Sequence, residues 1–246
     1  MNYLIEKYRT RALWLKARGI GGSDLAAIVN KVGRWANFIE VYDRLKGKPE
    51  PERDTVSMSR GRKAEEPVKE LFLLSHPELS RVSPKRSIWL IRRKDLREIT
   101  LSPDTLLRDR KGRKCFAEIK LKQVFGEAQI PTYLQSLREE EPQYWWQCMH
   151  YFVAMDDCAA GYLVVCFEVM EKDEKGKWRH SRFVIDELRI PREAVAEDIA
   201  LAEETLKAFI LENLRPGIRP KTTIQSERSE KKIEWTKSSS IRTLKP

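Results

Sequence analysis

Two acids and a lysine stand close together in the stretch PDTLLRDRKGRKCFAEIK, which begins at residue 103. Asp104 follows the proline, and Glu118 and Lys120 are two residues apart after the KG dipeptide. Residues two apart on a strand point to the same face. A hairpin turn centred on the KG dipeptide would place Asp104 opposite Ile119, with its carboxylate beside Glu118. We therefore expect two acids and one lysine to converge at one end of a hairpin.

This convergence is typical of a site for a hard divalent cation. Two carboxylates side by side repel each other unless positive charge lies between them. Mg²⁺ binds one or two carboxylates together with water and phosphate oxygens, and such a metal activates water for attack on a phosphate. Lys120 would then orient the attacking water or help to deprotonate it. The alternative is a solvated surface on which Asp104 caps a turn and Glu118 pairs with Lys120.

The elements that must position these residues can be read from hydrophobic periodicity. Helical spacing predicts helices over about 4–17, 23–29, 37–47, 60–76, 141–155 and 191–214, with Pro67 tolerated only near the start of its helix. Short apolar segments predict strands over about 86–92, 97–102, 105–109, 114–121, 159–171 and 179–188. Residues 49–55 are expected to form a loop. The order predicts an α/β fold in which one mixed sheet is flanked by helices.

Composition bounds the class of protein. The 246 residues are 41% hydrophobic and contain no apolar run long enough to span a membrane, so we expect a folded, cytoplasmic protein in one domain. The four cysteines form no C-x-x-C pair, which favours reduced core thiols over a zinc or iron–sulfur site. The net charge of +10 favours a polyanionic partner. We expect a domain over 1–214 and a basic, mobile tail over 215–246.

The hairpin and three flanking segments together resemble the PD-(D/E)xK nuclease superfamily, and within it the lambda-type phage exonucleases or YqaJ-like viral recombinases. Pro103-Asp104 and Glu118-Ile119-Lys120 match the superfamily signature. The segments GIGGSD, GRKAEE and YWWQCMHY occur in the order expected of that family. Taken alone, GIGGSD would be only a helix-capping turn, and the aromatic residues of YWWQCMHY would be core packing. The resemblance implies a restriction-endonuclease-like core of mixed β-sheet flanked by helices.

The resemblance also implies a role for each matching residue. Asp104 and Glu118, with the Ile119 carbonyl, would bind the catalytic Mg²⁺, for which Mn²⁺ can substitute. Lys120 would position the water, and Glu65 would supply a third carboxylate near the metal.

A second set of residues would hold the terminal phosphate, which suits a glycine-rich helix N-terminus. This set comprises Ser23, Ser102 and Gln147. The family places an arginine about seven residues before the motif serine, where this chain has Lys16. Arg18 lies nearby, and it is our choice because arginine binds phosphate in a bidentate manner.

Three functions are open at this point. The first is a Mg²⁺-dependent 5′-to-3′ exonuclease that degrades one strand of duplex DNA from a 5′-phosphorylated end and leaves 3′ single strands for phage-type recombination. The implied partners are DNA ends, a single-strand annealing protein and two further copies in a homotrimer, in a bacterial host cytoplasm and without a membrane. The second is a restriction-type or junction-resolving endonuclease, which needs no pocket for an end phosphate. The third is a catalytically silent DNA-binding module.

Overall fold

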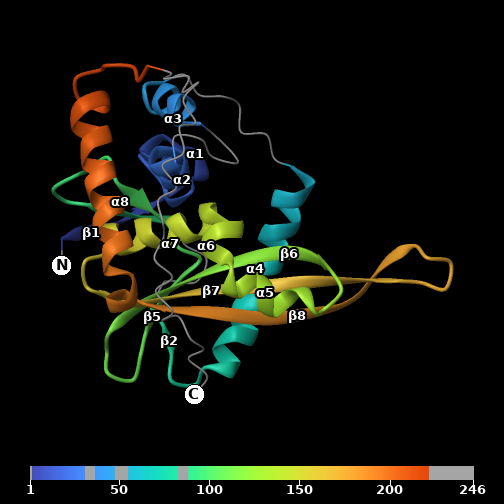
Figure 1. Ribbon diagram of the computed structural model, residues 1–246. Coiled ribbons are helices and arrows are strands. Elements are labelled where there is room, and N and C mark those ends of the chain that lie inside the picture. The colour runs from blue at the N-terminus through green and yellow to red at the C-terminus, as the bar shows by residue number, and fades with distance from the viewer. Residues whose placement is uncertain (1, 31–36, 48–54, 83–87, 222–246) are drawn as a thin grey trace.

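The computed structural model of the protein describes residues 2–30, 37–47, 55–82 and 88–221 (Figure 1). Its elements follow in chain order: β1 (Tyr3–Tyr8), α1 (Arg11–Ala17), α2 (Gly22–Asn30), α3 (Phe38–Leu45), α4 (Val56–Ser75), β2 (Ser80–Arg81), β3 (Ile88–Arg93), β4 (Thr100–Leu101), β5 (Thr105–Arg108), β6 (Lys114–Phe125), α5 (Gln129–Gln135), α6 (Leu137–Glu140), α7 (Pro142–Ala154), β7 (Cys158–Lys172), β8 (Trp178–Pro191), the 3₁₀-helix η1 (Arg192–Val195), α8 (Ala196–Ala208) and the π-helix η2 (Phe209–Leu214).

The larger sheet has five strands in the order β2-β5-β6-β7-β8. The central pair β6 and β7 is parallel, whereas the other pairs are antiparallel. Parallel neighbours need a crossover connection, and α5, α6 and α7 supply it. The strands β6 and β7 run across the molecule in Figure 1, with α7 beside them.

Each face of this sheet carries its own apolar core. Phe116 of β6 and Leu163 of β7 are fully buried in the cluster that contains α7 and α8. Ala117 and Val164, the next residues along, are buried in a smaller cluster that contains Val68 of α4. Because successive side chains of a strand alternate between faces, even-numbered residues of β6 face α7 and odd-numbered residues face α4.

A second, three-stranded sheet has the order β1-β3-β4, so the expectation of one sheet is wrong. The expected helix over 4–17 is wrong for its first half, where β1 pairs with β3 from Tyr3↔Arg93 to Tyr8↔Ile88. Aromatic and β-branched residues in this segment fit a pleated surface, and tertiary pairing outweighs the helical spacing. The helix α1 begins only after Thr10, whose side chain accepts a hydrogen bond from Leu13 N and caps it.

The helices differ from the expectation in two smaller ways. The helix α4 begins at Val56, capped by Thr55, so Pro67 lies well inside it, on an exposed side where its missing N–H removes one hydrogen bond. The helices α5 and α6 were not predicted, because their polar sequence lacks a clear apolar stripe. Most of the expected loop over 49–55 lies outside the described residues.

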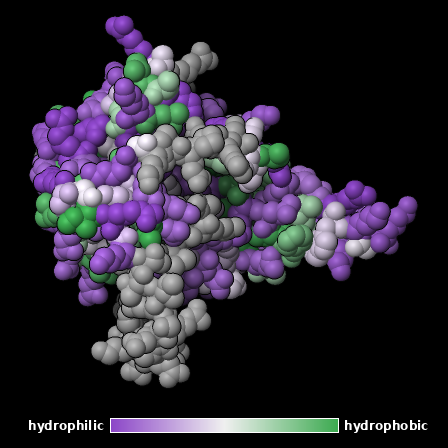
Figure 2. All heavy atoms as spheres, turned by 90° about the horizontal axis from the view of Figure 1, so that it is seen from above, coloured by the Kyte–Doolittle hydropathy of each residue, from purple (hydrophilic) through white to green (hydrophobic). Residues whose placement is uncertain are grey.

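The hairpin of β7 and β8 projects from the body as a long arm, visible in Figures 1 and 2. Its turn is closed by Asp173, which accepts hydrogen bonds from Lys175 N and Lys177 N, and by Gly176 at a φ of +74°. Figure 2 shows a hydrophilic tip and more hydrophobic residues nearer the body. The turn matches the one expected from the sequence EKGK.

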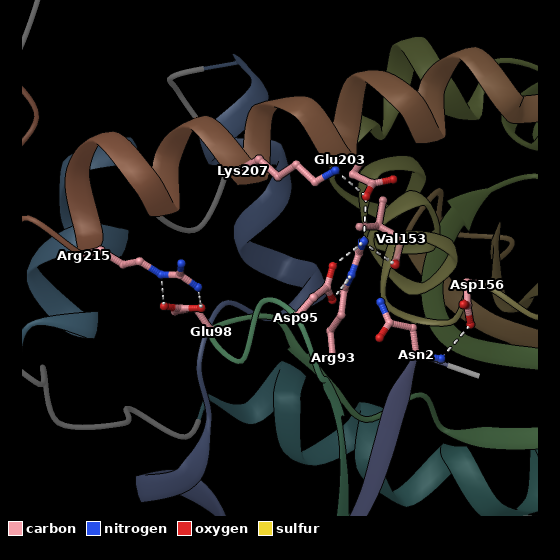
Figure 3. Close-up of polar contacts among 9 residues, drawn as sticks. All are labelled: Asn2, Arg93, Asp95, Glu98, Val153, Asp156, Glu203, Lys207 and Arg215. Carbon is pink, nitrogen blue, oxygen red and sulfur yellow. Dashed lines mark hydrogen bonds and ion pairs between the residues drawn. The ribbon is translucent and has the colours of Figure 1, made fainter.

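The C-terminal helix α8 packs beside α7 and is held there by a buried arginine (Figure 3). Arg93 of β3 donates to both carboxylate oxygens of Asp95, to Val153 O at 3.0 Å and to Glu203 Oε1 at 2.6 Å. Glu203 also pairs with Lys207 at 2.9 Å. The guanidinium thus joins the small sheet, α7 and α8 at one point.

Part of the expected tail lies on the domain. Arg215 pairs with Glu98, and Arg219 pairs with Asp43 at 2.7 Å. These two ion pairs connect Arg215 and Arg219 to the domain, and the boundary expected at 214/215 stays a prediction. Residues 222–246 lie outside the described residues. Within the described part, no helix is both long and apolar enough to cross a bilayer, and all four cysteines are free and buried.

The substitution Arg93→Met should lower the free energy of unfolding by roughly 2 to 4 kcal/mol, because it leaves a buried carbonyl and two carboxylates without their shared donor. Urea denaturation of the whole chain measures this. The control Arg215→Met removes an exposed guanidinium from a single ion pair with Glu98, also visible in Figure 3, and should have a much smaller effect. Equal losses of unfolding free energy in the two variants would contradict the conclusion that Arg93 joins the small sheet, α7 and α8.

Candidate active site

The two acids meet just before the first residue of β5, beside the middle of β6. The loop between these strands has Gly112 at a φ of +74°, and Gly112 N donates to Asp109 O. This extra left-handed residue shifts the register so that Thr105 pairs with Ala117. Asp104 is therefore level with Glu118, and the expected register with Asp104 opposite Ile119 is wrong by one residue. The shift still brings the acids together.

Asp104 lies against the open edge of β6. Its Oδ2 accepts a hydrogen bond from Ile119 N at 2.7 Å, because β5 begins only at Thr105 and leaves that donor to the side chain. A strand residue directs its N–H and C=O to the same side, so the Ile119 carbonyl points to this edge as well. A carboxylate and a backbone carbonyl thus face the same space.

Glu118 is buried, at 5% exposure, and is surrounded by donors on the α7 side of the sheet. Its Oε1 accepts from Lys120 Nζ at 2.7 Å and from Gln147 Nε2 at 2.6 Å, and its Oε2 accepts from Tyr151 OH at 2.9 Å. Gln147 Nε2 also donates to Tyr151 OH at 2.8 Å. A buried carboxylate is stable when it is paired and hydrogen-bonded in this way.

One face of α7 supplies these contacts. Tyr144, Gln147 and Tyr151 recur at spacings of three and four residues, which places them on one side of a helix. Lys120 Nζ lies 5.0 Å from the centre of the Tyr144 ring. Tyr151 was expected only in the core, and its role as a donor to Glu118 was missed. Its place seven residues after Tyr144 in the YWWQCMHY segment was the available signal.

The electrostatics of the acid pair are those of a site that lacks positive charge. Burial and the neighbouring Glu118 carboxylate raise the pKa of Asp104 well above its usual value. Burial alone would lower the pKa of Lys120, but the Glu118 and Asp104 carboxylates raise it, so this lysine stays charged. Burial and Glu118 also raise the pKa of Glu65 on α4.

Glu65 therefore lies within the electrostatic reach of the pair, but its role as a metal ligand stays a prediction. In the part of the chain that the structure describes, no three His, Cys, Asp or Glu side chains gather closely enough to hold a metal ion. The oxygen donors at the open edge are Asp104, Glu118 and the Ile119 carbonyl. These hard oxygen ligands fit Mg²⁺ or Mn²⁺, which complete their coordination with water and phosphate.

A cavity of about 120 Å³ opens against Glu118 and contains the residues expected to hold a phosphate. Its lining includes Arg18, Ser23, Ser102 and Gln147. Ser23 is in the first turn of α2, where backbone N–H groups have no partner within the helix and attract anions. Four segments distant in the sequence thus meet in one cavity.

Arg18 rather than Lys16 reaches this cavity. Its guanidinium stacks on Trp14, 4.8 Å from the ring centre, and a methyl group added at Gly21 would lie 3.2 Å from Arg18 Nη2. Lys16 is exposed and does not line the cavity. Trp14 was not singled out in the sequence, although its spacing of four residues before Arg18 was a usable signal.

Two of the expected phosphate ligands already have partners. Ser102 Oγ donates to Trp89 O at 2.7 Å and accepts from Trp14 Nε1 at 3.3 Å. The Gln147 amide donates to Glu118 and Tyr151, as described above. These two residues therefore line the cavity while their hydrogen bonds hold its walls. Arg18 and Ser23 reach the same cavity from the end of α1 and the first turn of α2, and the role of all four as phosphate ligands stays a prediction.

Close packing of α2 on α7 forms the back of the cavity. A methyl group at Gly22 would lie 2.7 Å from Gln147 Cγ and 2.8 Å from Tyr151 Cε1, so only glycine permits this approach. Asp24 holds the loop before it, because its Oδ2 accepts from Gly21 N at 2.7 Å and pairs with Arg44 at 2.6 Å. The GIGGSD segment thus contributes both to the packing of α2 on α7 and to the lining of the cavity.

Comparison with known proteins agrees with this geometry. The alkaline exonuclease LHK-Exo from Laribacter hongkongensis superimposes with a TM-score of 0.52 at 16% identity, over 82% of this chain and 93% of that chain. The structure of LHK-Exo in complex with dAMP superimposes with a TM-score of 0.51 at 15% identity, over 82% of this chain and 94% of that chain. These likenesses show the fold, and within it the acid pair and its lysine lie together as the Pro-Asp and Glu-x-Lys pattern of the sequence predicts.

The family is also established. Residues 13–157 match the model of the YqaJ-like viral recombinase domain, more than half of the chain, and the protein belongs to this family. The resemblance drawn from the four sequence segments is thereby confirmed. No curated protein sequence matches the chain.

Binding of Mn²⁺ should release protons near the raised pKa of Asp104, because the metal requires the ionised carboxylate. The folded metal-free protein holds the Asp104 proton more tightly than the unfolded chain does. The contribution of Asp104 to the free energy of unfolding therefore rises as pH falls through its folded pKa, and bound metal opposes this rise. Titration calorimetry in two buffers of different ionisation enthalpy measures the release. Asp104→Asn should abolish it, whereas Glu139→Gln on the exposed surface should not. Undiminished release in Asp104→Asn would contradict the assignment.

Proposed function

We propose that the protein is a divalent-metal-dependent 5′-to-3′ exonuclease that hydrolyses one strand of duplex DNA from a 5′-phosphorylated end. The observation that carries this proposal is the cavity that contains Arg18 and Ser23 and opens directly against Glu118. An anion pocket beside a hydrolytic acid suits a substrate that presents a terminal phosphate next to the bond to be cut. An enzyme that cuts within a duplex has no use for such a pocket.

The cofactor in this proposal is Mg²⁺, with Mn²⁺ as a substitute. Asp104, Glu118 and the Ile119 carbonyl would hold it. When bound, the metal supplies an activated water and stabilises the negative charge that develops on the scissile phosphate. Glu65 adds negative charge near the pair, which favours a cation there.

The chain's own residues orient the reaction. The Glu118 and Asp104 carboxylates raise the pKa of Lys120, so in this proposal it contacts Glu118 as a positive charge and would orient the attacking water. Gln147 and Tyr151 hold the Glu118 carboxylate in one orientation. Arg18 would clamp the terminal phosphate, with its guanidinium flattened against Trp14.

The biological role follows from the family. Degradation from the 5′ end leaves a 3′ single strand, which is the substrate for a strand-annealing partner in phage-type recombination. A deoxynucleoside monophosphate such as the dAMP bound by LHK-Exo is the product class expected here. The annealing protein as partner and the homotrimer remain predictions that belong to this proposal.

Linear duplex DNA phosphorylated at one 5′ end should lose only the phosphorylated strand in the presence of Mg²⁺, and EDTA should stop the reaction. A gel assay that follows both labelled strands and a covalently closed circle measures this. Nicking of the circle would instead identify an endonuclease. Binding without cleavage of either DNA would leave a DNA-binding module.

Arg18→Gln should reduce the preference for a 5′-phosphate over a 5′-hydroxyl end by roughly 10- to 100-fold in kcat/KM, as expected for the loss of a charge-assisted hydrogen bond. Lys16→Gln is the matched control, because it removes the same charge two residues away, outside the cavity. The rate on hydroxyl ends should change little in either variant. A larger effect of Lys16→Gln would reassign the phosphate clamp.

A further inference from the structure

A second cavity, of about 480 Å³, lies beside the candidate phosphate pocket and is strongly basic. Its charged lining consists of Arg18, Lys46, Arg92, Arg97, Arg215 and a single acid, Glu98. It is formed where the end of α1, the end of α3, the loop before β4 and the end of η2 meet. No part of the acid pair or of α7 lines it. Arg18 is the residue common to both cavities.

Two of these cations have structural partners. Arg92 donates to Glu6 at 3.0 Å and to the Ala17 and Arg97 carbonyls at 2.7 Å, and so fixes the wall behind Arg18. Arg215 pairs through two nitrogens with both oxygens of Glu98, at 2.9 and 3.2 Å (Figure 3). Glu98 therefore compensates one arginine and does not neutralise the rest.

The excess positive charge belongs to Lys46 and Arg97. Both are exposed, and within the described residues neither has a carboxylate at ion-pair distance. Lys46 follows the end of α3, and Arg97 precedes Glu98 in the loop before β4. Two exposed cations that line a concave surface, together with guanidinium groups held by their own partners, suit a phosphate group. The cavity is also four times as large as the pocket for the end phosphate.

We propose that this basic cavity binds a backbone phosphate of the uncut DNA strand. This inference rests on the proposed exonuclease function. A terminal phosphate held by Arg18 in the smaller cavity is the end of the cut strand, and the rest of that strand extends past Glu118, away from Arg18. Nothing of the cut strand remains to reach the far side of Arg18. A phosphate there must come from the complementary strand, which continues as the 3′ overhang.

The test measures how tightly the protein binds a duplex with a recessed 5′-phosphate and a 3′ overhang. Fluorescence anisotropy reports the binding, in EDTA and over a range of salt concentrations. Lys46→Ser/Arg97→Ser should weaken binding and reduce the magnitude of the log–log salt slope by about 2, one for each cation lost. Glu98→Gln should strengthen binding, because it removes the one acid found among the described residues that line the cavity and releases Arg215. Binding of the cut strand alone should not change in either variant.

Arg110→Ser/Lys111→Ser is the matched control, with the same loss of charge on the exposed loop between β5 and β6. An equal effect of this control, or an equal loss with the cut strand alone, would overturn the proposal. Thermal stabilisation by inorganic phosphate that Lys46→Ser/Arg97→Ser abolishes, with duplex binding unchanged, would assign the cavity to a free anion and also overturn it. Because binding is measured without metal, absence of cleavage in the wild type would count against the proposed function alone.

Discussion

A carboxylate placed in a protein interior must be surrounded by donors, and much of this structure follows from that requirement at Glu118. Its oxygens take hydrogen bonds from Lys120 on the same strand and from Gln147 and Tyr151 on the crossover helix. These bonds fix which face of α7 meets the sheet. They also fix where α2 can lie, because Gly22 of α2 packs directly on Gln147 and Tyr151. The smaller cavity is the space left between these contacts.

The same carboxylate creates an imbalance of charge that gives the site its chemistry. Lys120 compensates Glu118, but Asp104 and Glu65 remain nearby, and burial together with the Glu118 carboxylate raises the pKa of each. The protein holds these acids in place through backbone pairing and packing rather than through mutual attraction.

The site was predictable from the sequence to the extent that its residues are local. Asp104, Glu118 and Lys120 lie on one hairpin, so strand alternation alone brings them together, and a register error of one residue did not separate them. Arg18, Ser23 and Gln147 come from distant segments, and only the family resemblance grouped them. Tyr151 and Trp14 were missed because an aromatic residue on an apolar face reads as core, and only the contacts reveal their hydrogen bonds. The strand β1 was missed because its partner β3 lies more than eighty residues away.

The parallel pairing of β6 with β7 has a consequence for the order of folding. The hairpin that carries both acids is closed by a short loop and can form from local contacts, whereas Gln147 and Tyr151 reach Glu118 only after the whole crossover has docked. Closing that long connection is the slow, entropically costly step. The two acids are therefore brought together before Gln147 and Tyr151, which restrain Glu118, are in place. Until α7 is in place, Glu118 remains hydrated and flexible, so the time at which the nuclease becomes competent is set by the docking of one helix.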